Sequence, residues 1–164
     1  MENFICSISH SESAFVKKYG KELFEILKRK TFKKSNYCCD GCGYDPFSIP
    51  GFDAKNLNKS LEAHLVEVNE KNPVDSKFKT LCKACHATQH IDTAATNNWV
   101  ELVNSYLSQA QIINACRTNS IKLYLDDGTI RKLKKTPAEL VNDLKTGERK
   151  NNKVKVIFTE KFVF

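Results

Sequence analysis

The chain has 164 residues, and its 41% hydrophobic and 27% charged residues are ordinary for a soluble globular protein of one domain, with or without a small appendage. No apolar run approaches the about 18 residues of a membrane span, and the first residues lack a basic start followed by an apolar stretch, so we expect a cytoplasmic protein without a membrane part. The net charge of +7 indicates nucleic acid only weakly, because a lysine-rich and asparagine-rich genome would explain it equally well.

The first predicted element is a helix over residues 13–30. Its apolar residues recur at helical spacing, with basic residues on the other face: Phe15, Tyr19, Leu23, Ile26 and Leu27. Ser11 or Ser13 could cap its start. Five basic residues cluster at its end, and they are predicted to contact phosphates: Lys28, Arg29, Lys30, Lys33 and Lys34. A solvated helix end is an equally good explanation of this run.

Four of the seven cysteines form two C-x-x-C pairs, Cys39 with Cys42 and Cys82 with Cys85. In a reducing compartment such pairs are more often metal ligands than disulfides. Two pairs commonly supply four thiolates to a tetrahedral Zn²⁺, each pair reversing the chain around the ion. We therefore predict one structural zinc. Cys38 would give the wrong spacing, so Cys39 is the preferred ligand.

Three of the four histidines lie near these pairs. The stretch 61–66 alternates like a strand. Leu61, Ala63 and Leu65 face one side, and Glu62, His64 and Val66 face the other. If the chain becomes helical after the second cysteine pair, His86 and His90 are four residues apart and share a helix face. A strand and a helix that bring three imidazoles together would make a second metal site, for Mg²⁺, Mn²⁺, Ni²⁺ or Zn²⁺.

The pattern after His90 predicts a helix from residue 97, with Trp99 in its apolar stripe and Ser108 as the cap of a further short helix. Cys116 falls in this second apolar pattern and is predicted to be a core residue.

The last third of the chain predicts a small β-α-β extension. Alternating residues around Asp127 and Gly128 predict a hairpin, a helix follows from Thr136 and Pro137 to Gly147, and a final strand covers residues 153–164.

The run from Tyr37 to His90, about a third of the chain, resembles the HNH nuclease family, the zinc-stapled branch of the ββα-metal fold. The resemblance rests on the first cysteine pair, on LEAH at 61–64 and on LCKACH at 81–86. It implies an α+β protein with a four-cysteine, zinc-stapled ββα-metal core, an N-terminal helix and a C-terminal helical and β-α-β extension. We expect one compact unit of three segments, 1–36, 37–93 and 94–164.

Two positions depart from the family pattern. The resemblance puts the general base at Leu65, which cannot accept a proton, and the family asparagine at Lys77. We therefore expect an impaired nuclease, to which Leu65→His, alone or with Lys77→Asn, would restore nicking activity if the metal site is intact. Two alternatives keep activity: His64 itself is the base, with Glu62 or His90 holding the metal, or Glu67 is the base.

Three functions follow from these observations. The first is an HNH-like, DNA- or structured-nucleic-acid-binding protein that is catalytically impaired. The second is an active metal-dependent endonuclease. The third is an adaptor or inhibitor that binds a protein partner and uses the zinc fold as a scaffold.

Overall fold

The computed structural model describes residues 12–146 and 154–164, so that Ser11 and Gly147 lie outside the described residues. Contacts divide the described chain into two units, residues 12–86 and residues 87–146 with 154–164. The division falls inside helix α4 (Lys83–Gln89). Within the described part of the chain, no helix combines the length and the apolar character that crossing a membrane requires.

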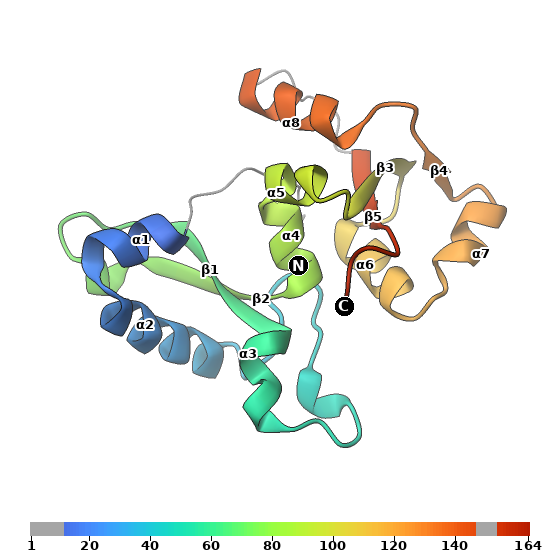
Figure 1. Ribbon diagram of the computed structural model, residues 1–164. Coiled ribbons are helices and arrows are strands. Elements are labelled where there is room, and N and C mark those ends of the chain that lie inside the picture. The colour runs from blue at the N-terminus through green and yellow to red at the C-terminus, as the bar shows by residue number, and fades with distance from the viewer. Residues whose placement is uncertain (1–11, 147–153) are drawn as a thin grey trace. The chain divides into compact units, whose positions relative to one another are not determined.

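The first unit is an antiparallel strand pair with helices around it (Figure 1). Its elements, in order, are α1 (Glu12–Tyr19), α2 (Lys21–Lys34), 3-10 turns at Pro46–Ser48 and Ala54–Asn56, α3 (Leu57–Ser60), β1 (Leu61–Glu67), a 3-10 turn at Pro73–Asp75, β2 (Lys77–Cys82) and the start of α4. The predicted helix over 13–30 is wrong in one respect, since it is two helices. Gly20 separates them with a φ of 91°, which glycine adopts without the steric cost that other residues have.

The apolar face of β1 packs on α1 and α2. Leu65 is only 1% exposed and forms a core cluster with Phe15 of α1 and Leu27 of α2. Alternation along the strand turns Glu62 and His64 to the other face, as predicted. Strand β1 pairs with β2 from Leu61↔Cys82 to Glu67↔Lys77 and includes His64↔Lys79, so the loop between the strands returns the chain directly to the second cysteine pair.

The second unit contains a three-stranded antiparallel sheet of order β4-β3-β5. Its elements after α4 are α5 (Ile91–Thr96), β3 (Val100–Ser105), α6 (Gln109–Arg117), α7 (Ile121–Asp126), β4 (Ile130–Lys132), α8 (Pro137–Thr146) and β5 (Val154–Phe158). The helix predicted from residue 97 is wrong, because β3 occupies this stretch. Val100 and Leu102 belong to one core cluster and Val103 to another, so both faces of β3 are covered.

The remaining predictions for this unit have mixed outcomes. Ser108 caps α6 through a capping box with Gln111, as expected, and Cys116 is buried in that helix. Helix α8 begins at Pro137, as predicted. The predicted hairpin around Gly128 is wrong, because the segment before this glycine is helix α7. The segment after it is strand β4, as predicted.

Candidate metal centres

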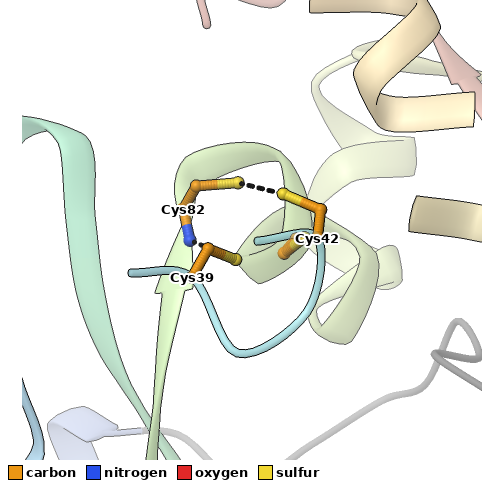
Figure 2. Close-up of side chains that lie close together, drawn as sticks. Cys39, Cys42 and Cys82 are labelled. Carbon is orange, nitrogen blue, oxygen red and sulfur yellow. Dashed lines mark hydrogen bonds between the residues drawn. The ribbon is translucent and has the colours of Figure 1, made fainter. Parts of the chain in front are cut away.

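Four cysteines come together where the turn after α2 meets the junction of β2 and α4. Cys39 and Cys42 lie in the turn, Cys82 ends β2, and Cys85 lies in the first turn of α4. All four are buried, and their sulfur atoms lie within 4.8 Å of one another. Figure 2 shows the side chains of Cys39, Cys42 and Cys82 gathered around one point. The group predicted from the two C-x-x-C pairs therefore exists.

The geometry of this group fits a tetrahedral metal ion such as zinc. The Sγ atoms of Cys42 and Cys82 are 3.7 Å apart. Thiolates about 2.3 Å from a tetrahedral zinc ion lie about 3.8 Å from one another, so the observed spacing needs little adjustment. Cys38 is half-buried, and its sulfur lies 3.5 Å from the carbonyl oxygen of Asn36, outside this group.

Hydrogen bonds position the first cysteine turn against β2. The Cys82 backbone N–H donates to Cys39 Sγ (3.2 Å), and the Asp40 backbone N–H donates to the Thr80 carbonyl oxygen (2.8 Å). The Thr80 N–H donates in return to the Asp40 carboxylate (2.7 Å). The hydrogen bond between Cys39 and Cys42 lowers the pKa of the Cys42 thiol and raises the pKa of the Cys39 thiol, so a metal ion that binds here would have to displace protons from the group.

A second group of donors forms on the polar face of β1. Glu12 Oε1 lies 3.1 Å from His64 Nδ1 and 3.4 Å from His86 Nε2. His64 comes from β1 and is 3% exposed, whereas His86 comes from α4 and is half-buried. His90 follows the last residue of this same helix, four residues after His86, and its ligand atom completes a group of four within 4.8 Å. The three predicted histidines therefore belong to one group.

A second carboxylate holds the other nitrogen of His86. Glu62 Oε2 lies 3.0 Å from His86 Nδ1. Burial alone would lower the pKa of His86, but its hydrogen bonds to Glu12 and Glu62 outweigh burial and raise this pKa to about 9. The hydrogen bond with His86 lowers the pKa of Glu62, and the positive charge of Lys28 acts in the same direction.

No protein-family model and no curated protein matches the sequence. The resemblance to the HNH family therefore rests on the residues of this chain alone.

Of the two alternative bases, His64 belongs to the histidine group and Glu67 does not, and Leu65, where the resemblance puts the general base, does not join it either. Leu65 faces the core formed with α1 and α2. Glu67 is exposed at the end of β1, and its carboxylate pairs with Lys77 Nζ at 2.6 Å.

The five predicted phosphate-binding residues all lie on α2, but they do not share one environment. Arg29, Lys30, Lys33 and Lys34 are exposed, as a phosphate-binding surface requires. Lys28 is half-buried, and its charge reaches Glu62 instead.

Sequence reasoning missed Glu12. It stands 52 positions before His64 in sequence, outside the stretch that resembles the HNH family, and a serine-rich helix start gives no sign of a ligand. The sequence analysis indicated a carboxylate ligand only in the alternative in which Glu62 holds the metal.

Proposed function

We propose that the protein is an HNH-like nucleic-acid-binding protein with a structural zinc, a second metal site and little hydrolytic activity. The strongest support for this proposal is that the same three elements supply residues to both groups of donors. One strand–strand–helix unit, β1-β2-α4, supplies Cys82 and Cys85 to the first group, and His64 and His86 to the second. A divalent ion held by nitrogen and oxygen donors can bind a phosphoryl oxygen, which is consistent with a nucleic-acid ligand.

The exposed basic residues of α2 are the proposed contact with nucleic acid. Charge reversal of two of them, Arg29→Glu with Lys33→Glu, should weaken binding to a short DNA duplex by tenfold or more at low salt. The reason is that phosphate contacts release counterions, which also makes the affinity fall steeply with salt. Fluorescence anisotropy across a salt series measures both the affinity and its slope.

A double variant at two other exposed lysines of the first unit, Lys55→Glu with Lys59→Glu, carries the same change of charge and serves as the control. If both double variants weaken binding equally, binding of DNA depends on the net charge of the protein and not on a specific surface of α2. If the wild type binds no nucleic acid at low salt, the adaptor function replaces this proposal.

One observation favours the endonuclease alternative. Glu12 Oε1 lies 3.1 Å from His64 Nδ1, and a nearby carboxylate stabilises the positive charge that an imidazole gains when it accepts a proton from water. A bound divalent ion would supply charge stabilisation at the scissile phosphate. Against this alternative, His64 is almost completely buried, which limits its access to a substrate.

We therefore expect wild-type protein to nick supercoiled plasmid slowly or not at all with Mg²⁺, Mn²⁺ or Ni²⁺, and His64→Ala to differ little from it. Loss of a general base alone typically costs about 10²–10⁴ in rate. The assay follows conversion to open-circular plasmid on a gel, with Glu67→Ala as the matched control. Rapid nicking that His64→Ala abolishes and Glu67→Ala leaves intact would instead favour the active endonuclease, in which His64 is required as base or as metal ligand.

A further inference from the structure

We propose that Glu12 of the N-terminal helix is a ligand of the second metal site, and that Glu62 positions His86 for this metal. The site would then bind a first-row transition metal ion through two kinds of donor, imidazole nitrogen and carboxylate oxygen. This inference rests on the second metal site of the proposed function. It adds a ligand from α1, which precedes the part of the chain that resembles the HNH family.

The spacing of the donors supports Glu12 as a ligand. Nitrogen and oxygen ligands about 2.0–2.2 Å from a tetrahedral ion lie about 3.4 Å from one another. Glu12 Oε1 lies at 3.1 Å and 3.4 Å from the nearest nitrogens of His64 and His86. The Leu65 backbone N–H also donates to Glu12 Oε1 (3.1 Å), which fixes the carboxylate beside the strand.

Glu62 has the geometry of a positioning residue. Its carboxylate lies at His86 Nδ1, so the Nδ1 atom carries the proton in a metal-bound state and Nε2 faces Glu12 and His64. Histidine ligands of metals usually donate their other N–H to a carboxylate in this way, which fixes the ring and raises its basicity. Glu62 reaches His86 from the same face of β1 as His64, and it does not touch the metal position in this arrangement.

The chemistry of the donors indicates the class of metal. Mg²⁺ prefers oxygen ligands and keeps several waters, whereas imidazole suits Zn²⁺, Co²⁺ and Ni²⁺. The single negative charge of Glu12 would neutralise half of the charge of a divalent ion. Glu62, which contacts the other nitrogen of His86, would balance the remaining charge. Of the metals predicted for this site from the sequence, Mg²⁺ is therefore removed, and the transition metals remain.

The test uses full-length protein with zinc already bound, titrated with Co²⁺. Cobalt bound to nitrogen and oxygen gives weak visible bands that are distinct from the intense charge-transfer bands of cobalt thiolates, so the two sites are read separately. Wild type should bind one Co²⁺ in addition to its zinc. Glu12→Gln should weaken Co²⁺ binding by at least tenfold, and Glu62→Gln by about 10–100-fold. Glu22→Gln, an exposed residue in the first turn of α2, is the matched control and should bind as wild type does.

An NMR measurement tests whether Glu62 positions His86, and it does not depend on the affinity for Co²⁺. The His86 Nδ1 proton, held by Glu62, should appear as a paramagnetically shifted exchangeable NMR resonance in the cobalt-bound wild type. Glu62→Leu, which removes the acceptor, should lose it, and Glu62→Gln, which keeps an acceptor oxygen, should retain it. Zinc content and circular dichroism establish that each variant is folded.

The outcomes separate this inference from the proposed function. If wild type binds Co²⁺ and His64→Ala abolishes binding, but Glu12→Gln and Glu62→Gln bind as tightly as wild type, the carboxylates only pair with a protonated His86 and the inference is wrong. If wild type binds no second ion, the second metal site of the proposed function is wrong as well, while binding of nucleic acid through α2 stands on its own test.

Discussion

Replacing Cys82 with serine should remove the bound metal and unfold residues 12–86. Apparent binding free energies of structural zinc are about 10–16 kcal/mol at neutral pH, and a whole domain is stable by only about 5–15 kcal/mol. Cys82 ends β2 and also donates its backbone N–H to Cys39, so the substitution acts where the two cysteine pairs meet. Elemental analysis should show loss of one zinc per chain, and the thermal unfolding curve of the first unit should disappear or shift by tens of degrees.

Cys38→Ser is the matched control for this prediction. Cys38 is adjacent to Cys39 in sequence but is outside the group of four, so the variant should keep its zinc and nearly its full stability. Chelation of the wild type should reproduce the effect of Cys82→Ser, because either change leaves the buried cysteine group without its ion. Full zinc content and an unchanged melting curve in Cys82→Ser would show that the cysteine group is not a structural metal site.

Leu65→His should destabilise the protein and should not create a nuclease. Removing a buried leucine side chain typically costs about 2–5 kcal/mol, and a buried imidazole without a partner adds to this cost. The resemblance to the HNH family led to the opposite expectation, a gain of nicking activity. We now expect otherwise, because Leu65 is buried in the cluster with Phe15 and Leu27, on the face of β1 opposite His64.

Urea denaturation measures this effect as a change in the free energy of unfolding. Val66→His is the control, since Val66 is the next residue of the strand, is 43% exposed, and should change stability by no more than about 0.5 kcal/mol. A Leu65→His protein as stable as wild type, with nicking activity that the wild type lacks, would mean that position 65 can turn toward the histidines.

The parts of the site that were predictable from sequence depend on residues close together in the chain. Each cysteine pair is a local signal, and its two members need only one turn to face the same point. Alternation from residue 61 predicted β1. The spacing of His86 and His90 predicted that they lie close together, although His90 follows the end of α4 and is not on its face as expected. Glu12 was not predictable in this way, because its place beside His64 results from the packing of α1 on β1.

Strand β3 was misread for a physical reason. Its buried residues do not alternate, because the second unit covers both faces of the strand: Val100, Leu102 and Val103 are all buried. A strand of this kind loses its period of two and can imitate the apolar spacing of a helix. Its pairing partners lie far along the chain, as Val103↔Lys132 and Val100↔Phe158 illustrate.

Helix α7 was misread in the opposite direction. Ile121, Leu123 and Leu125 alternate as in a strand, yet Leu123 is 68% exposed. The residues that pack on the core are Ile121, Tyr124 and Leu125, at helical spacing. Gly128, with a φ of 77°, follows this helix and does not form a hairpin between two strands.

Helix α4 has a consequence for how the two metal groups respond to each other. Cys85 and His86 are consecutive residues of this helix, so the rotation of the helix about its axis that suits the cysteine group also sets the direction of His86. Metal binding at the two groups would therefore be coupled, and such coupling is reciprocal: any factor by which an ion at the cysteines changed affinity at the histidines, an ion at the histidines would change affinity at the cysteines. Loss of a metal ion from the cysteines, by chelation or by oxidation of the thiols, would then shift α4 and with it the position of His86 in the histidine group.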